Sequence, residues 1–211
     1  KEKRPLFYLN LILLFLLFAI GIIIAAYLYY INYEKQYRTE VEKQLNAIAD
    51  LKTGEIVQWR KERLGDGNIF FRNEILTGHV KRYLKDHTDK DAEKRIKTWI
   101  QQVQTSYNYN RIFLLDTKLT KRIITPEIID DNVPVIPPNF IDSLNSGKIV
   151  FEDFYRNEEL LKIFLRIFVP IIDGNNSNQF IGIIELRIDP EDYFYPLINQ
   201  WPTPSKTSET I

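Results

Sequence analysis

The chain has 211 residues, with 28 basic and 28 acidic side chains and a formal net charge of zero. This balance excludes the global positive field with which proteins gather nucleic acid, so we expect no nucleic-acid partner. The chain contains no cysteine, which excludes disulfides and thiolate metal sites and leaves packing alone to hold an extracytoplasmic domain together.

An uncharged apolar run extends from Leu11 to Ile31 and contains a single glycine, Gly21. As a helix it would span roughly 31 Å, which matches the hydrocarbon core of a bilayer. Aromatic residues gather at both of its ends, where amphipathic rings favour the headgroup region. They are Phe7 and Tyr8 at one end and Tyr27, Tyr29, Tyr30 and Tyr33 at the other. A cleaved signal peptide and a buried core helix are the alternatives, but a signal h-region is shorter and a core helix carries a polar stripe. We therefore predict a transmembrane helix over residues 11–31.

Basic residues crowd the short segment before this helix, at Lys1, Lys3 and Arg4. Because cytoplasmic flanks carry an excess of Lys and Arg, residues 1–10 are predicted to be cytoplasmic and everything after Ile31 extracytoplasmic. The expected location is the cell membrane, with one crossing in this chain.

Helix is predicted to continue out of the membrane, because no Pro or Gly occurs between Ile31 and Leu51. One apolar stripe follows the helical repeat here and consists of Tyr37, Val41, Leu45, Ile48, Ile56 and Trp59. The stripe can pack on its own domain or on a second copy of the chain. For Tyr37 to Leu45, which lie close to the membrane, we favour a parallel homodimer.

Two further helices follow a turn at residues 65–68, where glycines and capping side chains end one helix and begin another. The first of them is predicted from Ile69 to Leu84. The second begins at an acidic cap near Asp89 and Asp91, and its apolar positions are Ile96, Ile100 and Val103.

After residue 107 the pattern changes to short, β-rich apolar runs separated by turn residues. The predicted strands are 111–116, 121–125, 148–155, 160–172 and 180–189. A proline-rich connection, 126–138, and a short helix, 139–145, separate the first two strands from the rest, and Pro190 begins an exit helix. Five antiparallel strands with helices on one face make an α+β architecture.

Two stretches resemble a known family. Residues 44–66 read QLNAIADLKTGEIVQWRKERLGD, and the end of the chain carries GIIELRIDP at 182–190, YPLI at 195–198 and WPTP at 201–204. The first stretch resembles the long entry helix of Cache, or extracytoplasmic PAS-like, sensor domains of prokaryotic membrane-bound sensor histidine kinases and related receptors. The second resembles their last strand and the segment that leads into a second, membrane-proximal module. The resemblance implies a sensor domain over residues 32–200 and a linker to a following module over residues 201–211.

The resemblance implies the ligand-sensing region of a transmembrane signal-transduction receptor, of the two-component type, with a small-molecule ligand. The sequence departs from the amino-acid-binding subset of the family, because no Arg is followed two residues later by Trp. The kinase activity of the family cannot be placed on any residue of this chain. A membrane-anchored partner-binding or tethering module without a small-molecule ligand is the alternative.

No catalytic, cofactor or metal signature appears in the sequence, so we expect no cofactor. His79 and His87 are eight residues apart, which on a helix points them in different directions and suits a shared metal poorly. Asp130 and Asp131 lack the oxygen-ligand spacing of a calcium loop. Serines lie outside any Gly-x-Ser-x-Gly pattern.

Strand alternation places candidate ligand-binding residues on two neighbouring strands. On 148–155 it groups Phe151, Asp153 and Tyr155, with Arg156 at the end, and on 160–172 it groups Lys162, Phe164, Arg166 and Phe168.

An interior Arg166 would require a partner, either Asp153 or an anionic ligand such as a carboxylate. We expect the small-molecule pocket near the proline-rich connection, and Tyr109, just before the first strand, is a further candidate for its mouth. In the alternative assignment, which we favour slightly, Lys162 and Arg166 face solvent. The core is then formed by Ile163, Leu165, Ile167 and Val169.

Overall fold

A computed structural model describes residues 4–127, 135–174 and 179–201. The chain divides into two compact units, Lys1–Glu55 and Ile56–Ile211, each described here by itself. Helix α1 (Arg4–Gly67) supplies the first unit and the beginning of the second.

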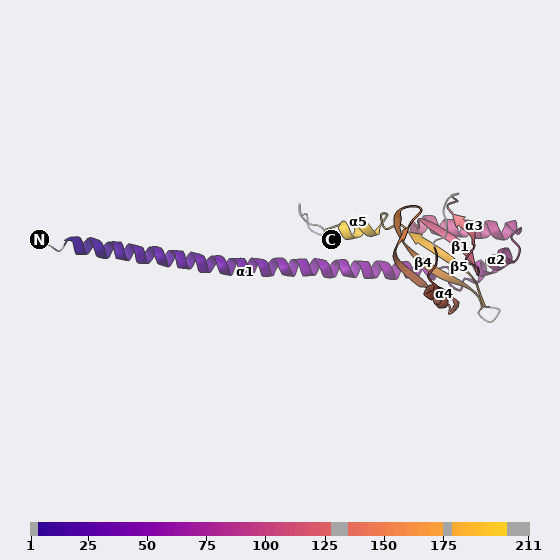
Figure 1. The fold of residues 1–211 in the computed structure, drawn as a ribbon, viewed down its shortest axis with the longest axis horizontal. Coiled ribbons are helices and arrows are strands. Elements are labelled where there is room, and N and C mark those ends of the chain that lie inside the picture. Colours follow the sequence, from indigo (N-terminus) through magenta and orange to yellow (C-terminus); the bar gives the residue numbers. More distant parts are fainter. Residues whose placement is uncertain (1–3, 128–134, 175–178, 202–211) are drawn as a thin grey trace. The chain divides into compact units, whose positions relative to one another are not determined.

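The second unit contains a five-stranded antiparallel sheet in the order β2-β1-β5-β4-β3. Figure 1 labels three of these strands, β1, β4 and β5. Its strands are β1 (Arg111–Asp116), β2 (Lys121–Thr125), β3 (Val150–Asn157), β4 (Lys162–Asp173) and β5 (Gln179–Ile188). Its further helices are α2 (Glu74–Lys85), α3 (Lys90–Tyr107), α4 (Pro138–Asn145) and α5 (Phe194–Asn199). The predicted α+β class and all five strands are confirmed, with the ends of β3, β4 and β5 shifted by one or two residues.

Side-chain caps fix where α2 and α3 begin. Asn73 accepts a hydrogen bond from the Leu76 N–H, and Asp89 accepts one from the Ala92 N–H. The predicted start of the second helix at Ile69 was wrong, because residues 68–72 form turns and Arg72 adopts a left-handed conformation with φ of 55°. The acidic cap at Asp89 is confirmed.

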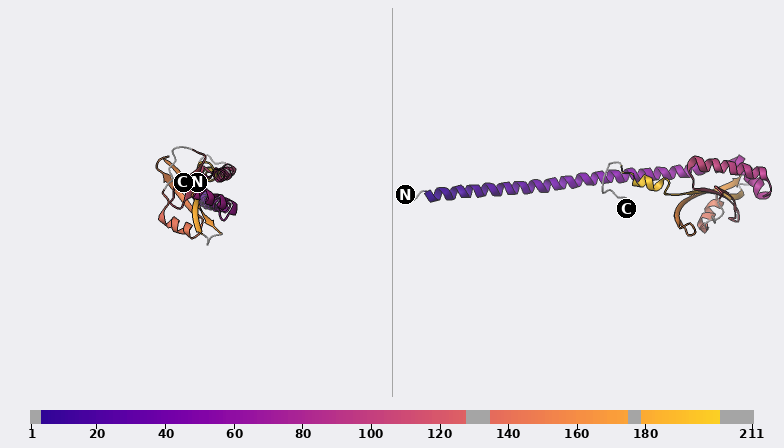
Figure 2. Two further views of the ribbon diagram at one scale, coloured as in Figure 1. Left: turned by 90° about the vertical axis from the view of Figure 1, so that its right-hand side faces the viewer. Right: turned by 90° about the horizontal axis from the view of Figure 1, so that it is seen from above.

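Both faces of the sheet are covered. The end of α1, with α2 and α3, packs on one face around Trp59, Phe70, Val80, Ile96 and Ile100. The short helix α4 packs through Leu144 on the opposite face, which the expectation of helices on a single face did not include (Figure 2). We call this opposite side the α4 face.

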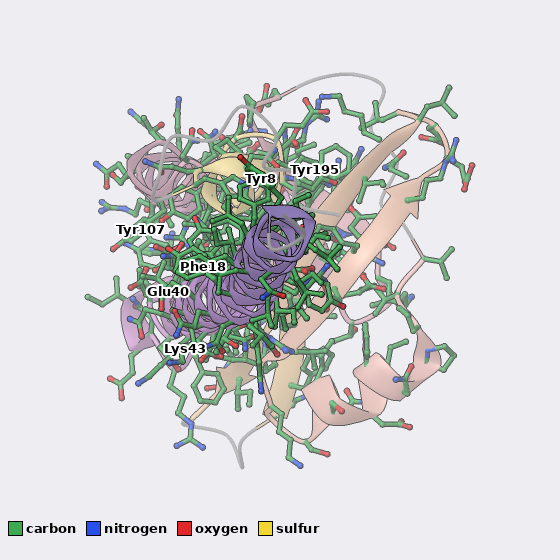
Figure 3. The ribbon with its side chains drawn as sticks, turned by 90° about the vertical axis from the view of Figure 1, so that its left-hand side faces the viewer. Tyr8, Phe18, Glu40, Lys43, Tyr107 and Tyr195 are labelled. Atoms are coloured by element: carbon green, nitrogen blue, oxygen red, sulfur yellow. The ribbon has the colours of Figure 1, made fainter. Side chains whose placement is uncertain are left out.

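The first unit is helical, and its large apolar side chains from Tyr8 to Tyr37 are exposed around the helix, as Tyr8 and Phe18 illustrate (Figure 3). Within the described residues, one helical stretch, Tyr8–Gly67, is long and apolar enough to cross a membrane. The rings of Tyr29, Tyr33 and Tyr37 stack in succession, with 6.4 Å between neighbouring centroids. Lys1 and Lys3 lie outside the described residues, as does the linker after Trp201.

Candidate functional site

A β-bulge in β3 decides which side chains reach the α4 face. Glu152 pairs with Arg166 and Tyr155 pairs with Phe164, so two residues of β3 oppose one residue of β4 between these pairs. The extra residue places Glu152 and Tyr155 on the same face and leaves Asp153 exposed. The expected grouping of Asp153 with Arg166 was therefore wrong.

A row of charged residues crosses the sheet on this face. Arg187 of β5 is the register partner of both Arg111 on β1 and Arg166 on β4, and Arg166 is the partner of Glu152 on β3. Directly paired residues point to the same side of a sheet. The next row on the same face carries Phe113, Glu185 and Phe168.

The central charges of these rows are buried. Arg166 is 2% exposed, while Arg187 and Glu185 are fully buried. Arg166 forms an ion pair with Glu152, lies 3.7 Å from a carboxylate oxygen of Glu185 and donates from Nη2 to the Val135 carbonyl at 3.0 Å. Such multiple partners are what a buried guanidinium requires.

The assignment of Arg166 to solvent was wrong, although part of that alternative was right. Leu165, Ile167 and Val169 do pack in the helix-covered core, whereas Ile163 is 46% exposed. Both faces of β4 are thus buried along most of its length, because α4 covers the second face. Lys162 does face solvent, and it pairs with Asp189 at 3.5 Å and Glu191 at 3.4 Å.

Aromatic rings enclose the two buried guanidinium groups. The Arg166 guanidinium carbon lies 4.2 Å from the centroid of Tyr155 and 4.8 Å from that of Phe168. The corresponding distances from Arg187 are 4.7 Å to Phe113 and 5.2 Å to Phe164. Ring faces attract these cations, so the rings are favourable walls for guanidinium groups.

The ring of Tyr155 that packs on Arg166 carries a hydroxyl group. It is buried and has no hydrogen-bond partner among the described residues. Burial raises the pKa of Tyr155 to about 12, so the phenol is neutral at physiological pH. The hydroxyl is therefore available as a polar contact beside Arg166.

The structure places two of the predicted site residues away from this cluster. Tyr109 is buried near the end of α1 and donates from its hydroxyl to Asp66 Oδ2 at 2.8 Å, and burial raises its pKa. Arg156 is exposed and lies 3.7 Å from Glu158. Of the five predicted residues, Tyr155 and Arg166 come together, whereas Tyr109, Asp153 and Arg156 do not join them.

Sequence reasoning missed Arg187, Glu185 and Glu152. The signal for the first two was present, because Glu185 and Arg187 alternate with Ile184, Leu186 and Ile188 along β5. Applying to β5 the strand alternation that identified Arg166 on β4 would have identified Glu185 and Arg187. Glu152 could not be found in this way, since the bulge reverses the alternation.

The α4-face cluster, defined as Arg111, Arg166, Arg187, Glu152 and Glu185, combines three arginines with two glutamates. This composition suits recognition of an anion by planar hydrogen-bond donors rather than nucleophilic chemistry. In the described ranges, no group of three His, Asp or Glu side chains could hold a metal ion. Asp130 and Asp131 lie outside those ranges.

No protein-family model and no curated protein matches the chain. Solved structures do match. The sensor domain of the Vibrio cholerae histidine kinase DctB superposes with a TM-score of 0.57 at 13% identity, covering 74% of this chain and 58% of that one. The extracellular domain of vpHK1S-Z8 gives a TM-score of 0.58 at 20% identity, covering 76% and 62%.

A third similar structure is the ligand-binding domain of the Pseudomonas aeruginosa PAO1 amino-acid chemoreceptor PctC in complex with GABA. Its TM-score is 0.50 at 16% identity, covering 76% of this chain and 69% of that one. The chain therefore spans less than two thirds of the first two domains. The fold is the Cache or PAS-like fold of receptor sensor domains, as the sequence resemblance predicted.

Proposed function

We propose that this chain is the ligand-sensing region of a membrane-anchored signal-transduction receptor, and that its ligand is a small organic anion bound at the α4-face cluster. The observation that carries the proposal is the pair of adjacent buried arginines, Arg166 and Arg187, within a fold shared with receptor sensor domains. The tethering alternative requires no such pair.

The energetics of the cluster support a binding role. Two like charges that are register partners repel each other, and each loses its hydration on burial. Replacing a buried ionic group by packed apolar side chains is often neutral or stabilising, so packing alone does not require these residues. Charged side chains are rarely fully buried, so these residues are candidates for a binding role.

The chemistry of the cluster favours a carboxylate. A guanidinium offers a planar fork that matches two carboxylate oxygens, and Tyr155 adds a hydroxyl at the same place. The rings of Phe164 and Phe168 supply the apolar wall expected of a small-molecule site. In this arrangement the ligand carboxylate takes the place beside Arg166 that Glu152 and the Val135 carbonyl now occupy.

The membrane arrangement belongs to the same proposal. The N-terminus is cytoplasmic, residues 11–31 cross the membrane, and residues 32–200 form an extracytoplasmic sensor. Two copies associate in parallel along Tyr37, Val41, Leu45 and Ile48. The parent receptor is a two-component histidine kinase. The long apolar helix supports the membrane span, and the basic residues before it support its orientation. The exposed Tyr37 and Leu45 support the dimer, and the similarity to histidine-kinase sensor domains supports the receptor class.

Thermal unfolding of the full chain in detergent micelles tests the ligand proposal. The probes are acetate, malonate, succinate and citrate, which differ in the number and spacing of carboxylates. A bound probe stabilises the folded state by about 2.7 kcal/mol at a hundredfold excess over its dissociation constant.

Arg166→Lys keeps the charge but removes the planar fork, and is expected to abolish the thermal shift. Arg156→Lys, a matched change at an exposed arginine, should leave the shift intact. The proposal fails if none of the probes stabilises the chain, or if the shift survives Arg166→Lys.

A further inference from the structure

A concave site lies on the helical side of the second unit, apart from the α4-face cluster. It is a groove of about 510 Å³ between α2 and α3. Its apolar lining comes from Ile75, Leu76 and Trp99. Leu76 is buried in the core, whereas Ile75 is 78% exposed and Trp99 is half-buried. The volume lies in the range of small-molecule sites.

The indole of Trp99 packs against a buried phenylalanine. Phe70, fully buried, meets Trp99 edge to face at a centroid separation of 4.9 Å. This contact fixes the plane of the indole while part of it remains accessible in the groove. An aromatic floor of this kind can contact a flat ring with little loss of side-chain entropy.

His79 contributes a polar atom without a partner. Its side chain lines the groove, and its Nδ1 is buried and makes no hydrogen bond to any described residue. A buried polar atom of this kind costs free energy unless a hydrogen bond is supplied from outside the chain. The second histidine, His87, is exposed and does not line the groove.

The charges around the groove leave one cation available. Arg95 donates from Nε to both carboxylate oxygens of Asp91, at 3.1 and 3.2 Å, so those two charges neutralise each other. Lys94 lines the groove, is exposed and forms no ion pair with any described residue. The groove therefore has a net attraction for a single negative charge.

We propose that this groove binds a small aromatic monocarboxylate, as a second ligand site of the domain. The ring lies against Trp99 and Ile75, the carboxylate pairs with Lys94, and a ring N–H donates to His79 Nδ1. The groove and the α4-face cluster lie on different faces of the sheet, so this site does not depend on the anion proposed for Arg166.

Three probes separate the proposed contacts. Indole-3-acetate has the aromatic ring, the carboxylate and the ring N–H, whereas indole-3-acetamide lacks the negative charge and phenylacetate lacks the ring N–H. The full chain in micelles is titrated with each, and the imidazole signals are followed by NMR. Only two histidines are present, so His87 serves as an internal control. Indole-3-acetate is expected to shift the His79 signals saturably and to leave those of His87 unchanged.

Lys94→Gln should weaken indole-3-acetate binding by about tenfold, which is the loss of one charge-assisted hydrogen bond. Lys85→Gln, at an exposed lysine outside the groove, is the matched control and should leave the affinity unchanged. Indole-3-acetamide lacks the negative charge that pairs with Lys94. Its affinity for the unaltered chain should therefore be no higher than the affinity of indole-3-acetate for the Lys94→Gln variant. Phenylacetate should leave the His79 Nδ1 signal unmoved.

The two sites can fail independently. Arg166→Lys should not alter indole-3-acetate binding, even though it removes the response to carboxylates at the α4-face cluster. The groove proposal is overturned if His79 does not respond to millimolar indole-3-acetate, if the acetamide binds equally well, or if binding is lost in Arg166→Lys.

Discussion

Two carboxylates from different strands surround the guanidinium of Arg166. Glu152 reaches it from β3 and Glu185 from β5, while the ring of Tyr155 lies against it. Asp153 is adjacent to Glu152 in sequence but is exposed, and it accepts a hydrogen bond from the neighbouring Phe154 N–H. The bulge thus gives two consecutive acidic residues different roles.

This difference predicts different costs of substitution. Glu152→Gln removes a carboxylate from a buried guanidinium and should lower the free energy of unfolding by about 1.5–3 kcal/mol. Asp153→Asn should change it by less than about 0.5 kcal/mol, as expected for an exposed position. Urea unfolding followed by tryptophan fluorescence measures both, because Trp59 is buried in the same unit. Equal effects of the two substitutions would contradict the register described for β3.

Asp116 organises the turn between β1 and β2. Its Oδ1 accepts hydrogen bonds from the N–H groups of Lys118 and Thr120, and its Oδ2 accepts from Arg122 Nε and Nη2 at 2.8 and 2.6 Å. Burial opposes ionisation, but these hydrogen bonds outweigh it and hold the pKa of Asp116 below its usual value. The folded state is therefore stabilised by the ionised carboxylate.

The sign of the pH dependence follows from this lowered pKa. The stabilisation is fully present above the pKa of Asp116 in the unfolded chain, about 3.9, and is lost as the pH falls through the lower folded value. Asp116→Asn should cost about 1–2 kcal/mol at pH 7. That cost should shrink progressively below about pH 4. A cost that stays constant from pH 7 to pH 2 would show that the charge of Asp116 does not stabilise the turn.

At the scale of elements, α1 carries an apolar stripe beyond the predicted membrane span. Tyr37 is 61% exposed and Leu45 is 51% exposed within the first unit. A stripe of this kind is stable in water only when a partner covers it. A second copy of the same helix would do so in parallel.

Cysteine scanning tests this dimer without background, because the natural chain has no cysteine. Disulfide yields at single positions from Val41 to Ile48 should follow the helical repeat. High yields are expected at Val41, Leu45 and Ile48, and low yields at Lys43, which lies off the stripe. A uniform yield along the segment would contradict a parallel helix pair.

The elements of this fold were predictable from local sequence, whereas several of their tertiary contacts were not. Turn residues and apolar alternation located all five strands, and Asp89 marked the start of α3. The bulge at Glu152 could not be predicted, because it has no glycine or proline signal and changes only the pairing with β4. The covering of the second sheet face by α4 also depends on tertiary packing.

At the scale of the whole molecule, aromatic side chains connect the end of α1 to α5 within the second unit. Trp59 of α1 is 5% exposed and lies 5.2 Å from the ring centroid of Phe194 in α5. Phe194 also contacts Phe154 of β3 at 5.2 Å. Phe194 therefore contacts both α1 and β3, so a movement of β3 on ligand binding would reach α1 and α5 through this side chain.

The proposed membrane topology gives a direct prediction for the chain in a bacterial cell. Alkaline phosphatase fused after Lys52 should be active, because that enzyme folds only outside the cytoplasm, and a cytoplasmic reporter at the same position should be inactive. The basic flank at residues 1–4 is the physical reason. The opposite pattern of reporter activity would place the second unit in the cytoplasm.

The central claim is that the α4-face cluster is the sensory ligand site, and hydrogen–deuterium exchange tests it most directly. The full chain in micelles is compared with and without a saturating carboxylate that raises its unfolding temperature. Binding at Arg166 predicts slower amide exchange in β3, in β4 around Arg166 and near Val135, with no change in α2 and α3. Protection confined to α2 and α3, or absent from the cluster, would contradict the account.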